Sequence, residues 1–310
     1  MARITLDDIS EAFRISGLKN FEGINKPLGG GEINDTFQIS YNDKKAILRI
    51  AKHPDQNSLH QEARALQLLN SAQIPKLIYF DENNRINGRQ WILESYIPGS
   101  SLERLSVNQF YSLGVLLANI HRVKSGKVGI NIWSCFLEEC KMFGDENFLL
   151  NHPNSTLNGL ISLAKKYFER LQPELLVVPE SLIHGDATPN NILVQDKTLS
   201  LIDWEFSKYK DPMAEFSTIF YEDMEYNQGK WRVHINDKEK TALYDGYASA
   251  DGKIDEDRVK IWMNFNKLGA AVFLYWRINQ SNREASQEQQ IQYQIDFDNL
   301  ISSLQQHLTA

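Results

Sequence analysis

The order of apolar and polar residues near the N-terminus predicts a short helix followed by strands. Apolar residues recur at helical spacing between Leu6 and Phe13. Thr5 precedes this run and Asp8 stands one turn further on, an arrangement typical of a capping box. The helix is expected to end at Gly17, because a residue without a Cβ atom adopts the left-handed conformation that closes many helices.

The following segment has the pattern of a small β-rich lobe. Residues 37–41 and 46–50 alternate between apolar and polar, and Asn42-Asp43 separates them, which predicts a β-hairpin. A helix and then two further strands are expected at 58–69, 77–80 and 90–96. Beyond Pro98-Gly99 the pattern is mostly helical, apart from short apolar strands at 181–183, 192–194 and 199–202. An α+β fold is therefore expected, with a small N-terminal lobe over 1–97 and a larger, mainly helical C-terminal lobe over 98–310.

Composition excludes several classes of protein. The chain has 310 residues, of which 42% are hydrophobic and 24% charged, as in ordinary soluble globular proteins. The first residues are polar and acidic, and the longest apolar run, Leu268–Trp276, is too short to span a bilayer, so we expect a cytoplasmic protein without a membrane partner. A net charge of −7 with no basic cluster argues against a nucleic-acid partner and suits a cationic substrate. Cys135 and Cys140 match no usual metal or redox spacing.

One group of residues in the second half of the chain has the side-chain types and spacing of a catalytic site. His184-Gly185-Asp186 is followed by Asn191 and, after another apolar strand, by Asp203. A hydroxyl that attacks the γ-phosphate of ATP needs a carboxylate to orient it, and Mg²⁺ to neutralise the phosphates. Asp186 is of the right type for the first role, and Asn191 and Asp203 for the second. An isolated His-Gly-Asp is more often a turn. The order and spacing of the whole set are those of a kinase catalytic loop and metal-binding aspartate.

The glycine run at 29–31 is a weaker signal for phosphate binding. Backbone without Cβ atoms approaches phosphates closely, but a glycine run between strands is usually a hairpin turn. The run is neither a Walker loop nor a dinucleotide fingerprint, because no Gly-Lys-Ser/Thr and no helix follow it.

Periodicity pairs a cation with a carboxylate downstream of this run. Arg49 lies on the face of its strand opposite Ala46 and Leu48, which alone would indicate a solvated side chain. Glu62, however, falls on the apolar stripe of the next predicted helix, and a carboxylate facing a core is costly unless a cation meets it. We therefore predict that Arg49 and Glu62 form a pair that holds the α- and β-phosphates of ATP.

With these residues assembled, the chain resembles the aminoglycoside phosphotransferase and choline kinase superfamily over most of its length. The resemblance implies a bilobal, protein-kinase-like fold with a small antiparallel sheet, ATP and Mg²⁺ as cofactors, Asp186 and His184 as catalytic residues, and Asn191 and Asp203 as metal ligands. The segments similar to the nucleotide-binding parts of that family contain Gly30, Gly31, Asn34, Arg49, Glu62, Glu94 and Tyr96. His121 is expected in the core. Two departures from the family pattern are Glu215 in place of aspartate and Asn190 in place of glycine.

The acceptor is less well defined by sequence. The stretch after Asp203 is closest to the choline and thiamine kinase branches, and it is rich in acidic and aromatic residues, which suit a quaternary ammonium ion. Most aromatic residues at helical spacing belong to cores, and acidic residues often form a solvated face. The substrate-binding candidates are Glu205, Asp211, Tyr221 and Trp276. We expect a kinase for a small cationic alcohol, with choline first, thiamine or an aminoglycoside as alternatives, and a non-catalytic nucleotide-binding module as the alternative of another class.

Overall fold

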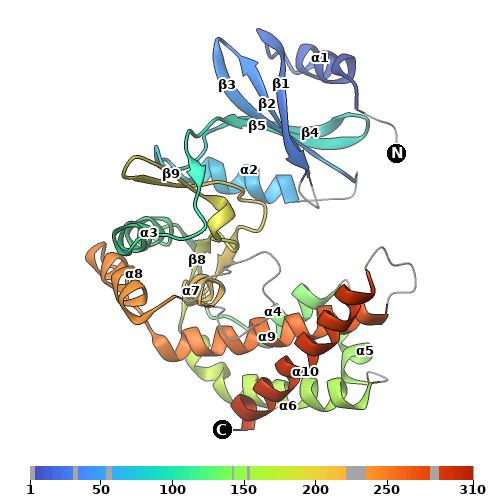
Figure 1. The fold of residues 1–310 in the computed structure, drawn as a ribbon, viewed down its shortest axis with the longest axis vertical. Coiled ribbons are helices and arrows are strands. Elements are labelled where there is room, and N and C mark those ends of the chain that lie inside the picture. The colour runs from blue at the N-terminus through green and yellow to red at the C-terminus, as the bar shows by residue number, and fades with distance from the viewer. Residues whose placement is uncertain are drawn as a thin grey trace. The chain divides into compact units, whose positions relative to one another are not determined.

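The computed structural model describes residues 4–30, 34–53, 58–141, 143–151, 154–220, 235–279 and 286–309. These residues form two compact units (Figure 1). Unit 1 comprises 1–105 and 184–208, and unit 2 comprises 106–183 and 209–310. Unit 1 thus contains the expected N-terminal lobe and, in addition, the segment 184–208 that carries the predicted catalytic residues.

Unit 1 is built on an antiparallel sheet of five strands within the described residues, in the order β1-β2-β3-β5-β4. The strands are β1 (Phe21–Gly30), β2 (Asn34–Tyr41), β3 (Lys44–Ala51), β4 (Leu77–Ile86) and β5 (Arg89–Ser95). The β2–β3 pair is the predicted hairpin, with Phe37 opposite Leu48, and its turn residues Asn42 and Asp43 both have positive φ. The α+β class and the antiparallel sheet expected from the sequence are confirmed.

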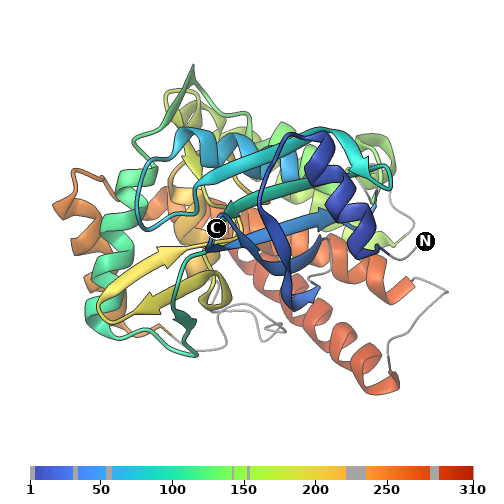
Figure 2. The same ribbon diagram turned by 90° about the horizontal axis from the view of Figure 1, so that it is seen from above.

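The helix α1 (Leu6–Ile15) covers one face of this sheet (Figure 2). Its capping box forms as predicted: Asp8 N–H donates to the Thr5 hydroxyl, and the Asp8 carboxylate accepts from Thr5 N–H. Phe13 stacks on Trp91 of β5 at a centroid distance of 5.2 Å. Because Ala46, Leu48 and Ile50 all face this core, the alternation of β3 sends Arg49 to the opposite face of the sheet.

The helix α2 (Ser58–Leu68) and a second small sheet complete unit 1. This sheet contains β6 (Ser100–Ser101), β9 (Ile192–Gln195) and β10 (Thr198–Leu201), preceded by the short 3-10 helix η1 (Pro189–Asn191). Its hairpin is attached to the segment after α2, because Leu201 N–H donates to Gln73 O and the Gln73 amide donates to Leu199 O. One backbone and one side-chain hydrogen bond of Gln73 therefore link the predicted catalytic hairpin to the rest of unit 1.

Unit 2 is mainly helical, as predicted for the C-terminal lobe. Its helices are α3 (Val107–Ile120), α4 (Ile132–Cys140), α5 (Glu146–Leu150), α6 (Ser155–Leu175), α7 (Met213–Ile219), α8 (Asp237–Ser249), α9 (Glu256–Asn279) and α10 (Gln287–Thr309). A three-stranded sheet joins β7 (Lys124–Val128) and β8 (Pro179–Ile183) to β11 (Lys208–Lys210), which begins at the last residue of unit 1. No helix among the described residues is both long and apolar enough to cross a bilayer.

The packing of α3 on α8 depends on two glycines. A Cβ atom on Gly114 would lie 2.1 Å from Leu243 O, and one on Gly246 would lie 2.0 Å from Tyr111 O. Only residues without side chains permit this approach of the two backbones. Nearby, His121 is buried and its Nδ1 lies 2.9 Å from the Tyr247 hydroxyl, which confirms the core position expected for this histidine.

Candidate active site

The turn after β8 is held in a tight conformation by Gly185. This residue has a φ of +82°, and a Cβ atom on it would lie 2.4 Å from Phe206 O. A side chain is therefore excluded both by conformation and by space. The result is that His184 and Asp186 are fixed on either side of the glycine.

His184 is fully buried and both of its ring nitrogens face backbone groups. Asp186 N–H donates to Nδ1 at 3.2 Å, so Nδ1 carries no proton, and Nε2–H then donates to Ile202 O at 3.0 Å. The ring also makes an edge contact with Trp204 at 4.5 Å between centroids. Both ring nitrogens are therefore engaged by the backbone of unit 1, and the catalytic role expected for His184 stays a prediction.

Asp186 and Asn191 are in direct contact, and Asp203 lies near them at the end of the hairpin. The Asn191 amide donates to the Asp186 carboxylate at 2.8 Å and to Asp186 O at 2.9 Å. Ile202 N–H donates to Asn191 O at 3.0 Å, which extends the β9–β10 ladder by one step. Asn191 and Asp203 consequently lie at the same end of the hairpin. Asn190 lies in η1 without positive φ, so the glycine usual at this place in the family is not required here.

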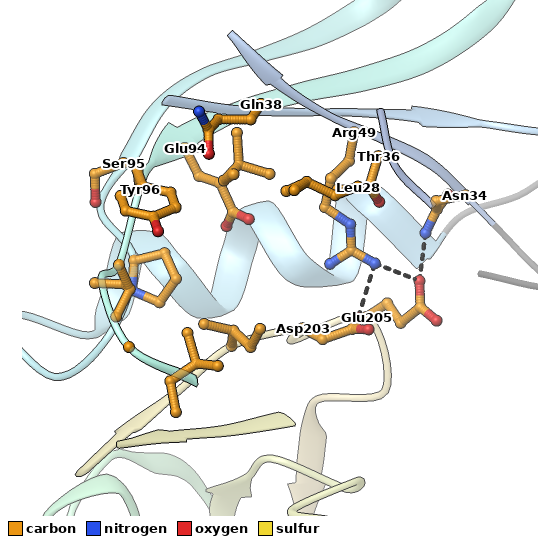
Figure 3. Close-up of a pocket in the computed structure, with 16 residues that line it drawn as sticks. Leu28, Asn34, Thr36, Gln38, Arg49, Glu94, Ser95, Tyr96, Asp203 and Glu205 are labelled. Atoms are coloured by element: carbon orange, nitrogen blue, oxygen red, sulfur yellow. Dashed lines mark hydrogen bonds and ion pairs between the residues drawn. The ribbon is translucent and has the colours of Figure 1, made fainter. Parts of the chain in front are cut away.

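Arg49 is the centre of the charged cluster in this unit (Figure 3). Its Nη1 contacts Glu62 Oε1 at 2.6 Å, while Nη2 contacts Asp203 Oδ1 at 2.8 Å and Glu205 Oε2 at 2.9 Å. The Asn34 amide donates to Glu205 as well. The pairing of Arg49 with Glu62 that periodicity predicts is thus present. The same guanidinium also contacts two carboxylates, those of Asp203 and Glu205.

These contacts shift the protonation equilibria of the cluster. Burial alone would lower the pKa of Arg49, but the carboxylates of Glu62 and Asp203, with smaller contributions from Glu94 and Glu205, outweigh it and raise that pKa. Burial, followed by the negative charge of Asp203, raises the pKa of Glu205 to about 7, against the opposing effect of Arg49. The guanidinium remains charged, while Glu205 is poised between its two protonation states near neutral pH.

The cluster lines one end of a cavity of about 350 Å³. Its wall is formed by the β2 and β3 side chains that face away from the α1 core, by the end of β5 and the segment that follows it, and by the β9–β10 hairpin and the residues after it, with Leu28 of β1 and Pro75 completing it. The lining residues are Leu28, Asn34, Thr36, Gln38, Ile47, Arg49, Pro75, Glu94, Ser95, Tyr96, Ile97, Gly99, Leu193, Ile202, Asp203 and Glu205. Sequence reasoning missed Thr36, Gln38 and Ile47, although the alternation of the hairpin places all three opposite the core.

The expected nucleotide-binding residues are distributed around this cavity. Asn34, Arg49, Glu94 and Tyr96 line it, and Glu62 reaches it through Arg49. Gly30 is the last residue of β1 and Asn34 the first of β2. Gly31 lies outside the described residues.

The expected acceptor-binding residues do not gather in one place. Glu205 lies in the cavity with Arg49. Asp211 is completely buried in unit 2, where its oxygens accept from Met213 N–H at 3.0 Å and from Trp262 Nε1–H at 2.9 Å. Trp276 packs with Phe143 at 5.5 Å in an aromatic group of unit 2. Tyr221 lies outside the described residues.

The chain matches the profile of a known protein family. The profile of the phosphotransferase enzyme family matches residues 25–262, which is more than half of the sequence. The chain belongs to this family. The predicted catalytic and phosphate-binding residues of unit 1 lie within the matched segment.

Individual relatives and solved structures are similar to the chain at low identity. Protein LicA of Haemophilus influenzae is 24% identical over 236 residues, a match that covers 75% of this chain and 65% of LicA. The crystal structure of choline kinase LicA from Streptococcus pneumoniae superposes with a TM-score of 0.64 at 21% identity, covering 96% of this chain and 99% of that one. A thermostable mutant of aminoglycoside phosphotransferase APH(4)-Ia, solved as a ternary complex with AMP-PNP and hygromycin B, gives a TM-score of 0.62 at 16% identity, with 94% and 98% coverage. This phosphotransferase therefore shares the fold of solved aminoglycoside and choline kinases.

Proposed function

We propose that this phosphotransferase moves the γ-phosphate of Mg·ATP to a hydroxyl group of a small cationic alcohol, with choline as the first candidate. The observation that carries the proposal is the hydrogen bond from the Asn191 amide to the Asp186 carboxylate, at 2.8 Å, in the same unit as the Arg49 cluster. It fixes a carboxylate beside a polar amide at the end of the hairpin that carries Asp203. This is the arrangement that phosphoryl transfer to an alcohol requires.

In this proposal Asp186 orients the acceptor hydroxyl and accepts its proton as the bond to phosphorus forms. Asn191 and His184 hold the Asp186 segment in place, through the side-chain amide and through the ring Nδ1 respectively. Neither needs to change its protonation state. Catalysis then depends on positioning and charge stabilisation more than on covalent chemistry.

The donor set fits Mg²⁺. Asp203 offers a carboxylate whose side chain is 35% exposed, and Asn191 retains its amide oxygen because its nitrogen donates to Asp186. Within the described residues, no group of three or more His, Cys, Asp or Glu side chains is arranged to hold a metal. Mg²⁺ prefers few protein ligands and completes its shell with phosphates and water, so this sparse set suits it. When bound there, the ion neutralises charge on the phosphates.

Arg49 is proposed to bind the phosphates of ATP. Glu62 and the Asp203–Glu205 segment fix the orientation of its guanidinium, and its Nε has no hydrogen-bond partner within the described part of the chain. A planar, permanently charged group held by carboxylates is preorganised for phosphate. Every part that phosphoryl transfer requires is therefore present with suitable chemistry, which argues against a non-catalytic module.

Support for a cationic acceptor comes from charge and from the relatives. The chain carries a net charge of −7, and unit 2 contains an aromatic group around Trp276. One superposed structure is a choline kinase. Aromatic faces and carboxylates bind quaternary ammonium ions, each well-placed ring contributing on the order of 1 kcal/mol.

The test is a panel assay with purified protein. Mg·ATP is incubated with choline, thiamine or hygromycin B, and ADP release is measured for each. Acceptor-dependent release with choline alone supports the proposal, and release with another member reassigns the acceptor. Release with none of them, while nucleotide still binds, overturns the kinase proposal in favour of a binding module. The Asp186→Asn variant serves as the control for contaminating kinases.

A further inference from the structure

A buried carboxyl group at the back of the cavity has no role in the mechanism above. Glu94 is the penultimate residue of β5 and stands directly opposite Ile47 of β3, which in turn stands opposite Gln38 of β2. Opposite residues of an antiparallel ladder project to the same face, so the three side chains form one row across the sheet. Figure 3 shows the Glu94 carboxyl pointing into the cavity beside Tyr96 and away from the Arg49 contacts.

One oxygen of the Glu94 carboxyl is unpaired within the part of the chain that the structure describes. The residue is 4% exposed, and within the described residues its Oε2 has no hydrogen-bond partner. The nearby guanidinium of Arg49 is already engaged by Glu62, Asp203 and Glu205. Leaving a buried acceptor unpaired costs about 1–3 kcal/mol. A polar group retained in this state inside a cavity is suited to a donor that arrives with a ligand.

The position of Glu94 indicates which part of a ligand would meet it. It lies between the segment that follows β5 and the Arg49 cluster, next to the apolar side chain of Ile47. Under the proposed function the phosphates occupy the Arg49 end, so a flat base lies against Ile47 and presents its edge to Glu94. This step rests on the proposed function.

We propose that Glu94 determines base specificity, its carboxyl accepting a hydrogen bond from the exocyclic amino group of adenine and thereby selecting ATP over nucleotides with a 6-oxopurine base. Adenine presents an amino donor at position 6 next to a ring-nitrogen acceptor, whereas guanine and hypoxanthine present a carbonyl acceptor at position 6. A carboxyl oxygen therefore attracts the first and repels the second.

The electrostatic surroundings of Glu94 disfavour its charged form. Burial raises the pKa of Glu94 well above its ordinary value, and the charges of Glu62 and Asp203 act in the same direction against Arg49. A neutral carboxyl group still accepts a hydrogen bond through its carbonyl oxygen, so the contact with the amino group of adenine does not require the charged form of Glu94.

The experiment compares three Mg²⁺-nucleotides by calorimetric titration without acceptor: ATP, ITP and purine riboside 5′-triphosphate, which lacks only the amino group. The wild-type protein is expected to bind ATP about tenfold more tightly than purine riboside triphosphate, and ITP more weakly still, as for one buried hydrogen bond. Glu94→Met removes the acceptor and should bring ATP and purine riboside triphosphate to equal Kd. Glu94→Gln keeps one acceptor and one donor and should retain the preference. Glu82→Met, at an exposed position of β4, is the matched control and should leave all three values unchanged.

The outcomes separate the two proposals. Binding of ATP and ITP with equal Kd, or a preference that survives Glu94→Met, overturns base selection by Glu94 and leaves the kinase proposal intact. Failure of the wild-type protein to bind any of the nucleotides contradicts the proposed function itself. Thermal unfolding of each variant reports on folding, and Glu94→Gln keeps the test informative if Glu94→Met does not fold.

Discussion

Glu62 accepts a hydrogen bond from Arg49 at 2.6 Å, and the same oxygen accepts one from Trp204 N–H at 3.1 Å. A single, completely buried carboxylate thus joins α2 and β3 to the segment that carries Asp203. Because Arg49 also contacts Asp203, the proposed phosphate-binding cation and metal-binding aspartate are positioned by one network. Displacement of any member is expected to affect the others.

Glu62→Gln is expected to raise KM for ATP and lower kcat, reducing kcat/KM by on the order of a hundredfold, because the guanidinium loses its fixed orientation. Arg49→Lys should be only partly tolerated, since an ammonium lacks the planar fork that reaches a carboxylate and a phosphate together. The decisive measurement is the double variant. Two residues that act as one unit give non-additive losses in kcat/KM. Strictly additive losses would contradict the unit, and Arg85→Lys, in an ion pair elsewhere in unit 1, should leave kinetics unchanged.

Asp186→Asn is expected to remove phosphoryl transfer while Mg·ATP binds with nearly unchanged Kd. The carboxylate is assigned to the acceptor hydroxyl, and loss of a general base typically costs about 10²–10⁴ in rate. The substituted amide oxygen still accepts from the Asn191 side chain, so the turn should keep its structure. Steady-state kinetics and calorimetry on the same preparation test this. An equal weakening of turnover and nucleotide binding would instead place Asp186 at the nucleotide.

Asp203→Ala is expected to abolish the dependence of ATP binding on Mg²⁺. Its carboxylate is the exposed member of the Arg49 cluster and the proposed metal ligand. Calorimetric titration of ATP with Mg²⁺ and with EDTA measures the effect. Asp196→Asn, in the exposed turn of the same hairpin, should retain the full Mg²⁺ dependence. Retention of that dependence in Asp203→Ala would exclude the assignment.

Local sequence periodicity was sufficient to predict much of the structure of unit 1. Residues close in sequence determine the capping box of α1 and the β2–β3 hairpin. The Arg49–Glu62 pair was predictable because Glu62 falls on the apolar stripe of α2, where its buried charge must be neutralised. The carboxylate of Glu62 was the most informative feature, because burying an unpaired carboxylate is energetically unfavourable and a nearby cation is therefore expected.

Contacts between distant segments were not predictable in the same way. Nothing in the local pattern shows that Glu205 contacts Arg49 and Asn34, since the β9–β10 hairpin is brought to the sheet through Gln73 and β6. The acidic character of the Asp203–Glu205 segment suggested a cationic substrate for Glu205. The structure places that side chain in the cavity in contact with Arg49, and its place there depends on tertiary packing.

The two cysteines are expected to differ strongly in reactivity. Cys140 is 1% exposed, and burial, assisted by the charge of Glu139, raises the pKa of its thiol to about 12, whereas Cys135 is half-buried. At pH 8 a shift of this size lowers the thiolate fraction by roughly a thousandfold. Titration with a chromogenic disulfide should therefore label Cys140→Ser, which retains Cys135, at least tenfold faster than Cys135→Ser. Equal rates in the native state would contradict the burial of Cys140, and guanidinium should equalise the two.

Gly114→Ala is expected to destabilise unit 2, because the added methyl group would lie 2.1 Å from Leu243 O and 2.7 Å from Tyr247 N. Both are backbone atoms, so α3 and α8 must separate, at a cost of about 1–3 kcal/mol or more in the free energy of unfolding. Gly159→Ala is the matched control: a methyl group on this exposed glycine of α6 would have no atom within 4 Å, and the change should stabilise the protein by about 0.5–1 kcal/mol. Differential scanning calorimetry should therefore show shifts of opposite sign. A Tm for Gly114→Ala at or above that of the wild-type protein would mean that the two helices do not approach this closely in solution.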